Sequence, residues 1–178
     1  MDIFSHALWS GGIYKAISLP PRKKLKILWA VFFGVAPDLF SFGILFIENL
    51  FFRGLFRPEF ASGEHGLNGA FVPHYVFTLY NYTHSLIVFL AVFLLIWLIR
   101  RKPFWEMGTW GLHILSDIPT HTSRFFPTPF LWPFSPYKAS VISWARLEFL
   151  IPNYSLLIIF YGIIYWLNKR PNKKTPQI

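Results

Sequence analysis

The chain has 178 residues, enough for one domain, and it is rich in hydrophobic (54%) and aromatic (21%) residues. Its mean hydropathy of +0.42 is high for a soluble protein and is typical of a membrane protein. The net charge of +9 does not indicate a nucleic-acid partner, because the basic residues form short clusters beside apolar runs without any nucleic-acid-binding motif. The absence of cysteine excludes disulfides and thiolate ligands, so a metal would have to be bound by His, Asp or Glu.

Five membrane-embedded helices are predicted, in a single integral membrane domain covering residues 1–178. In chain order they are an amphipathic segment (2–19), two apolar runs (27–47 and 85–99), a second amphipathic segment (104–118) and a last apolar run (154–167). Each apolar run approaches the roughly 20 residues that span a bilayer once aromatic residues at the interface are included. We therefore expect an all-α, polytopic transmembrane bundle.

Proline residues and loops separate these helices. Pro103 is expected to open the fourth helix, and Pro119 is expected to end it, because proline disfavours the α conformation in the preceding residue. The stretch "FFPTPFLWPFSP" (residues 125–136) contains four prolines and predicts a loop. Residues 48–82 are expected to form a long loop on the same side of the membrane.

Three basic clusters orient the helices. They lie at residues 22–26, 100–102 and 168–174, each beside an apolar run, as cytoplasmic flanks of membrane helices do. The topology that follows places both long loops outside and the C-terminus in the cytoplasm of a multi-pass cell-membrane protein. The first residues lack a basic region and a cleavage site, so we interpret them as retained structure rather than a signal peptide.

Ionisable side chains recur at similar distances from these clusters. At about 1.5 Å per helical residue, they lie roughly 15 to 24 Å above the nearest one. They are His6, Asp38, His84, His113 and Asp117, from four different segments. Ionisable groups inside a membrane are costly unless they are paired or bind a metal, so the common depth predicts a metal site in the outer half of the membrane.

The stretch "GLHILSDIPTHTS" gives the strongest local signal. His113 and Asp117 are four residues apart and share one helical face, so they can chelate one ion or bridge two. Asp2 and His6 have the same spacing. His121 follows a proline, so helical phase does not place it, but it can fold back over the site.

Several of these residues also have purely structural interpretations. His6 could cap a helix or lie at the membrane interface, Asp38 follows a proline and could cap a broken helix, and His84 could begin a helix. His65 and His74 fall in the expected outer loop and are predicted to be solvated.

Four short motifs occur in a characteristic order: "DIFSH" at the start, "APD" in the second segment, "THS" before the third and "HILSDIPT" in the fourth. This order resembles the YdjM-like family of membrane-bound metal-dependent hydrolases, which is distantly similar to zinc-dependent phospholipase C. The resemblance implies metal ligation by His6, Asp38, His84, His113 and Asp117, with Asp2 and His121 as further ligands. The chain differs from the family at Phe40, where a second acidic residue is common, and before "THS", where a His-Arg pair is common.

These features predict a membrane-bound metal-dependent hydrolase that acts on a phosphoester or lipid-like substrate at the outer face of the membrane. Zinc is the expected ion, with manganese as an alternative, and membrane lipids are the expected partners. Asp117 or Asp38 would act as general base if it is not taken up as a metal ligand, while Arg146 or Arg124 would hold an anionic substrate.

Two other functions remain open on this sequence. One is an ion or proton transporter, which would need a polar path to the cytoplasmic side. The other is a metal-binding membrane protein without catalytic activity. Few ionisable residues lie between the expected site and the basic clusters, Lys15 and Glu106 being the exceptions near the cytoplasmic ends, and this favours a hydrolase.

Overall fold

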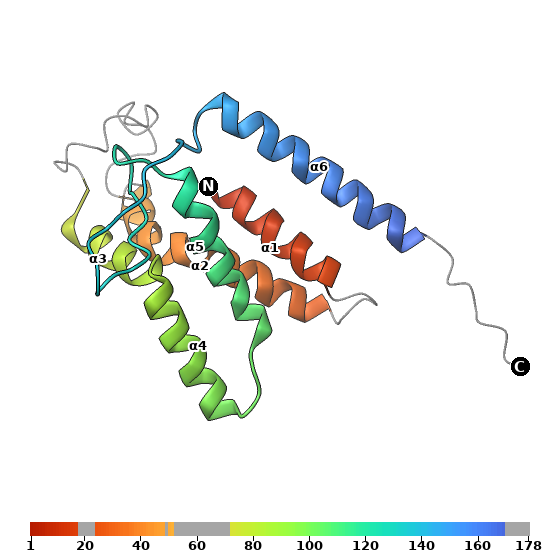
Figure 1. The fold of residues 1–178 in the computed structure, drawn as a ribbon, viewed down its shortest axis with the longest axis horizontal. Coiled ribbons are helices and arrows are strands. Elements are labelled where there is room, and N and C mark those ends of the chain that lie inside the picture. Colours follow the sequence, from red (N-terminus) through yellow and green to blue (C-terminus); the bar gives the residue numbers. More distant parts are fainter. Residues whose placement is uncertain (18–23, 49, 52–71, 170–178) are drawn as a thin grey trace, which may run out of the picture.

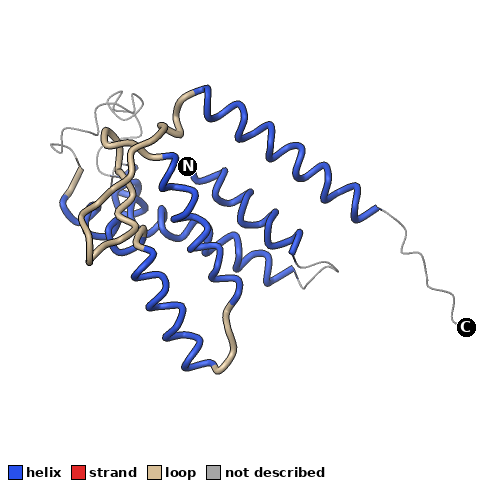
Figure 2. Tube along the Cα trace, viewed as in Figure 1, coloured by secondary structure: helices blue, strands red, loops and turns tan. Residues whose placement is uncertain are grey.

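The computed structural model describes residues 1–17, 24–48, 50–51 and 72–169. Within them the chain is all-helical and contains no strand, so the expected fold class is confirmed. The elements are α1 (Ile3–Ile17), α2 (Lys24–Glu48), α3 (His74–Thr83), α4 (Leu86–Arg100), the 3-10 turn η4 (Trp105–Met107), α5 (Gly108–Thr120) and α6 (Leu147–Lys169) (Figures 1 and 2).

The predicted number of membrane-embedded helices is wrong. In the described part of the chain, two segments are long and apolar enough to cross a bilayer: Lys26–Ile47 of α2, with 22 residues, and α6, with 23. Helices α3 and α4 form a third candidate span only when they are taken as one segment bent by 58°. The remaining two, α1 with 15 residues and α5 with 13, are shorter than the roughly 20 residues of a full span.

Both helix boundaries predicted from proline are also wrong. Pro103 lies before η4, and α5 begins only at Gly108. Pro119 lies inside the last turn of α5, which continues to Thr120. This turn is held by the loop before α6: Trp144 N donates to the Thr120 carbonyl at 2.9 Å, and Ile142 N donates to the Pro119 carbonyl at 3.2 Å. These bonds satisfy groups that a helix end leaves unpaired.

The loops are partly as predicted. Residues 125–136 are irregular, and the loop is fixed to the start of α4 by hydrogen bonds from Leu86 N to Phe130 O, at 3.0 Å, and from the Ser85 hydroxyl to Trp132 O. The predicted outer loop contains α3, with His74 exposed at its first turn. His65 lies outside the described residues, as do residues 22–23 and 170–174 of the basic clusters.

Helices α1, α2 and α5 pack around the centre of the bundle. A Cβ on Gly34 of α2 would come within 2.0 Å of the Ser10 hydroxyl of α1, so only glycine permits this close approach. Small residues at such contacts are typical of membrane helix pairs. The approach also carries the Gly34 carbonyl toward α5, where it contacts a histidine described below.

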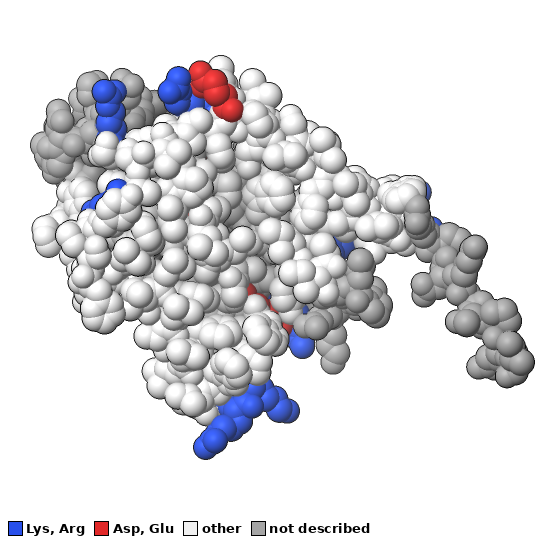
Figure 3. Space-filling model, in the orientation of Figure 1, with Lys and Arg blue, Asp and Glu red and all other residues white. Residues whose placement is uncertain are grey.

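Helix α6 lies outermost and packs along α1 (Figure 1). It begins seven residues before the apolar run predicted for it, and it buries Asn153, Leu157 and Ile164. Many of its other apolar side chains are exposed, as is Ile158, with 74% of its surface accessible. In Figure 3 charged side chains lie at the two ends of the bundle and the visible surface between them is largely uncharged. Such a surface is typical of a membrane protein.

Candidate metal centre

Three structural units bring four of the predicted ligands together. Asp38 comes from α2, His84 from the corner between α3 and α4, and His113 and Asp117 from α5. One donor atom from each lies within 4.8 Å of the others. Three of these side chains are fully buried, whereas that of Asp38 keeps 16% of its surface exposed. This buried group could hold a metal ion.

The distances within this group match those between the ligands of one small ion. The Nε2 atoms of His84 and His113 are 3.1 Å apart. Asp38 Oδ1 lies 3.4 and 3.7 Å from these two nitrogens, and Asp117 Oδ2 lies 3.5 and 3.2 Å from them. Four ligands at 2.0–2.2 Å from a tetrahedral zinc ion would be separated by about 3.3–3.6 Å. Five of the six separations between the donors, at 3.1 to 3.7 Å, lie close to this range, and the sixth, between the two carboxylate oxygens, is within 4.8 Å.

Hydrogen bonds on the far side of each ring assign its tautomer. His113 Nδ1 lies 2.7 Å from the Gly34 carbonyl, which can only accept, so Nδ1 carries the proton. His84 Nδ1 lies 2.9 Å from the Thr83 hydroxyl, which itself donates to the Leu79 carbonyl at 2.9 Å and accepts from His84. In the neutral rings both Nε2 atoms therefore present lone pairs to each other. Two lone pairs 3.1 Å apart repel unless a metal ion or a proton lies between them.

A second group of donors surrounds the other oxygen of Asp117. Oδ1 lies 3.0 Å from His6 Nε2 and 3.7 Å from His121 Nε2. The Met1 amino group donates to the same oxygen, and to the Thr120 hydroxyl at 3.0 Å. Asp117 therefore faces imidazoles through both oxygens, as a carboxylate that bridges two ions would.

Two of these buried atoms lack a hydrogen bond within the described residues. They are His6 Nε2 and Asp117 Oδ2. His6 Nε2 is close to Asp117 Oδ1 but does not have the geometry of a hydrogen bond to it. Buried polar atoms are normally paired, and leaving them unpaired costs roughly 1–3 kcal/mol each. A metal ion in the first group would satisfy Asp117 Oδ2, and one in the second group would satisfy His6 Nε2.

His121 lies just after α5 and is oriented by Tyr80. Its Nδ1 is 2.7 Å from the Phe126 carbonyl, which also accepts from the Tyr80 hydroxyl at 2.7 Å. Burial lowers the pKa of His121, against a smaller opposing effect of Asp117, which favours the neutral ring that binds metals. The predicted return of His121 to the site is thus present in the structure.

Asp2 has a different place. It precedes α1, where Oδ1 accepts from Ser5 N and the Tyr154 hydroxyl, both at 2.9 Å, and Oδ2 accepts from the Ser5 hydroxyl at 2.6 Å. Burial raises the pKa of Asp2, but these hydrogen bonds outweigh it and the pKa lies below the usual value. Asp2 acts as the N-cap of α1, and the structure does not bring it to the other donors.

The two predicted substrate-binding arginines lie at the surface. Arg124 is exposed, and Arg146 is paired with Glu148, with Arg146 Nε 3.3 Å from Glu148 Oε2. An exposed pair of this kind contributes little to stability. Neither arginine belongs to the buried donor groups, so a role in holding substrate stays a prediction.

Comparisons of this chain with protein-family models, curated proteins and solved structures gave no match. The candidate metal centre therefore rests on its own geometry.

Supporting residues were missed in the sequence. Tyr80 stacks on His84, with ring centroids 3.8 Å apart, and also fixes His121. The spacing of Tyr80 and His84 is i, i+4, which would have placed both on one face of α3. The contact of Gly34 with His113 joins two helices distant in sequence, so no local pattern indicates it.

The Tyr80→Phe variant tests this support. It keeps the ring that packs on His84 but removes the hydroxyl that bonds to Phe126 O beside His121. We expect zinc affinity to fall by about 10- to 100-fold, the usual effect of losing a group that orients a metal ligand. Competition with a chelating indicator measures it. Tyr82→Phe, at a half-exposed site, is the matched control, and equal zinc affinity of both variants would rule out the role given to Tyr80.

Proposed function

We propose that this protein is a membrane-bound metal-dependent hydrolase that acts on a phosphoester or lipid-like substrate. The observation that carries the proposal is the compact buried group of two imidazoles and two carboxylates with one partly exposed member, Asp38. A purely structural site needs no exposed ligand, whereas a catalytic site keeps an open side for substrate.

Zinc fits the donor set best. Two imidazole nitrogens and two carboxylate oxygens, without thiolates, are typical zinc ligands. Manganese shares the preference for carboxylates and is the second candidate. His6 and His121, beside Asp117 Oδ1, would supply two imidazoles to another ion, which would take the place where the Met1 amino group now donates to that oxygen.

The residues divide the chemistry between them. A divalent ion would supply Lewis-acid chemistry, lowering the pKa of water toward neutrality and polarising the ester. Asp38 is better placed than Asp117 as general base, because its side chain alone of the four keeps part of its surface exposed and Asp117 faces imidazoles through both oxygens. His84, His113 and Asp117 would then hold the ion as its three protein ligands, which leaves a position for water. In the reaction a water oxygen bonds to the ester's phosphorus or carbonyl carbon. The bond to the alcohol oxygen breaks, and the proton taken from water passes to that alcohol.

The resemblance to the YdjM-like family belongs to the same proposal. Each of its four motifs contributes at least one residue to the donor groups: His6, Asp38, His84, and the pair His113 and Asp117. This agreement supports a hydrolase, while the substrate rests on the family resemblance alone.

Transport is the second candidate function. Glu106 is buried and accepts a hydrogen bond from Tyr14 at 2.9 Å, near the basic end of α5. On α5, no titratable residue lies between Glu106 and His113, and the Thr109 hydroxyl donates to the Ala30 carbonyl at 2.6 Å. A chain of proton-transferring groups along α5 would be interrupted between Glu106 and His113, so we favour hydrolysis.

Hydrolysis is tested with purified protein and a panel of soluble phosphoesters and short-chain phospholipids. Activity is expected to rise with pH through roughly 7, to disappear after chelation and to return with zinc or manganese. Release of phosphate or alcohol is the readout. Fully metal-loaded protein that cleaves no phosphoester, lipid or amide would contradict the proposed function.

We also propose the orientation given by the basic residues. Lys15, Arg100 and Lys169 end α1, α4 and α6, and these ends point toward the same lower right side of Figure 1. That side would be cytoplasmic, and the metal centre would lie nearer the outer face.

Single cysteines test this orientation, since the chain has none of its own. Lys138→Cys and Arg101→Cys introduce thiols at exposed positions in opposite end loops. In intact cells an impermeant maleimide is expected to label the Lys138→Cys variant and to spare Arg101→Cys until the membrane is permeabilised. The reverse pattern would invert the topology.

A further inference from the structure

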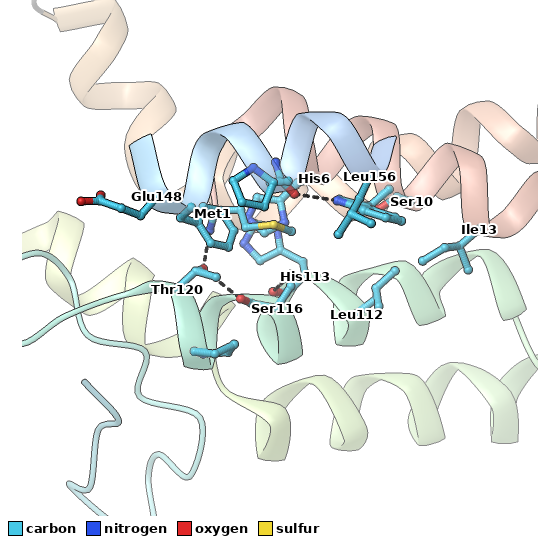
Figure 4. Close-up of a pocket in the computed structure, with 15 residues that line it drawn as sticks. Met1, His6, Ser10, Ile13, Leu112, His113, Ser116, Thr120, Glu148 and Leu156 are labelled. Carbon is cyan, nitrogen blue, oxygen red and sulfur yellow. Dashed lines mark hydrogen bonds between the residues drawn. The ribbon is translucent and has the colours of Figure 1, made fainter. Parts of the chain in front are cut away.

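A pocket of about 350 Å³ lies between α1, α5 and α6 (Figure 4). Each helix contributes one face to it: α1 with residues such as His6 and Ile13, α5 with Leu112 and His113, and α6 with residues around Leu156. We call it the α6 trough. Its volume is near the lower end of the range for small-molecule pockets.

The side chains that line the α6 trough change from polar to apolar along its length. One end contains Glu148 and Thr120, and Glu148 carries the ion pair with Arg146. The opposite end is formed by Ile13 and Leu112 (Figure 4). A ligand that fits this gradient has one charged or polar end and one apolar end.

The middle of the trough borders the metal centre. His6 and His113 form part of its wall, while the Nε2 atoms of the same rings face Asp117. The two rings are stacked, with centroids 3.6 Å apart. A ligand lying in the trough would therefore pass directly beside the donor groups.

The direction of the trough matches that of a lipid chain. It runs along α6, which is long and apolar enough to cross a bilayer and whose outer surface is exposed and apolar. A hydrocarbon chain in a bilayer also lies roughly along the membrane helices. A polar pocket wall would exclude such a chain, but the wall at Leu112 and Leu156 does not.

We propose that the α6 trough binds the hydrocarbon chain of an amphiphilic phosphoester, with the phosphoester beside His6 and His113 in the middle of the trough and the chain against Ile13, Leu112 and Leu156. This inference rests on the proposed function and specifies its substrate: a phosphoester with a single long apolar chain accommodated in the protein. The two proposals can nevertheless fail separately, because the α6 trough could bind a hydrocarbon chain even if the protein cleaved no ester.

Linear alkylphosphonates from ethyl to dodecyl test the trough, because a phosphonate presents a phosphate-like head group that is not hydrolysed. The probe is titrated into zinc-loaded full-length protein in amphipol, with calorimetry as the readout. Affinity is expected to rise up to about fourfold for each methylene that enters the trough, and then to reach a plateau.

Leu156→Trp fills the apolar part of the trough. It should weaken dodecylphosphonate binding by about tenfold or more, as two or more methylenes are excluded, and leave ethylphosphonate binding unchanged. Ile158→Trp is the matched control, on the same helix at an exposed position that does not line the trough. Equal dodecylphosphonate binding by the two variants, or no dependence on chain length, would overturn the inference.

The two proposals give distinguishable results. Chain-length-dependent binding that Leu156→Trp removes, in a protein that cleaves no ester, would support the trough and contradict the hydrolase. Cleavage of short-chain esters without any chain-length dependence would support the hydrolase and contradict the trough.

Discussion

Replacing both His113 and Asp117 with Ala is expected to remove bound metal almost completely. These residues supply two of the four donors, and Asp117 also faces the second group through its other oxygen. The remaining side chains, among them His84 and His6, cannot complete either position. Metal analysis of dialysed protein should fall from at least one equivalent to near zero.

The same double variant is expected to lose stability. Metal binding to the folded state contributes directly to folding free energy, and buried polar groups left unpaired add a further cost. Loss of one partner from a buried charged pair typically lowers the free energy of unfolding by about 3–5 kcal/mol. Denaturant unfolding in one fixed detergent measures the change.

His74→Ala provides the control for both measurements. His74 is exposed at the start of α3, and the bonds recorded for it are local ones to Thr78. Its replacement should leave metal content and unfolding free energy close to those of the unmodified protein. Full metal occupancy in the His113→Ala, Asp117→Ala protein would show that the ion is bound elsewhere.

The Asp38→Asn variant is expected to lose most hydrolytic activity while still binding metal. The amide oxygen can occupy the position of Asp38 Oδ1, 3.4 Å from His84 Nε2, but an amide cannot accept a proton from water. Loss of a general base typically lowers kcat by about 100- to 10,000-fold. Steady-state kinetics at saturating zinc, with metal content measured on the same samples, separates the two effects.

Normal turnover by the Asp38→Asn variant would exclude Asp38 as the general base. Ser41→Ala is the matched control, since Ser41 lies one turn along α2 and its hydroxyl donates to the Pro37 carbonyl and contacts Thr83. Its loss disturbs the surroundings of the site without removing a carboxylate. Only a small decrease in kcat is expected there.

The sequence predicted which residues the structure brings together in the candidate metal centre better than it predicted the membrane architecture. His113 and Asp117 were recognisable because burying two ionisable side chains on one face of an apolar helix costs free energy unless they are paired or bind an ion. His6, Asp38 and His84 followed from a shared distance to the basic clusters. That argument succeeds because antiparallel helices of a bundle bring residues at one level together.

The number of spanning helices could not be read from hydropathy alone. Helices α1 and α5 are short and are positioned by contacts with α2, so their role depends on tertiary packing. The bend at His84 and Ser85 depends on Ser85 accepting hydrogen bonds from Ile87 N and Val88 N at 3.2 Å, which begins a new helix. A hydropathy window averages over such a cap and joins the two helices.

Asp2 was assigned to the metal site through the same spacing rule that identified Asp117. The rule places Asp2 and His6 four residues apart, but Asp2 precedes the helix, where a carboxylate satisfies free N–H groups. Spacing alone does not distinguish a helix cap from a ligand. The first residue of the helix has to be known before this spacing can be interpreted.

X-ray absorption at the zinc edge tests the metal centre most directly. Zinc-loaded protein, dialysed to remove loosely bound ions, should show nitrogen and oxygen ligands at about 2.0–2.2 Å, with imidazole scattering from at least two histidines. The His113→Ala, Asp117→Ala protein should lose this signal. A zinc ion surrounded only by oxygen atoms without imidazole, or protein that retains no zinc after dialysis, would contradict a metal centre built from α2, α5 and the corner between α3 and α4.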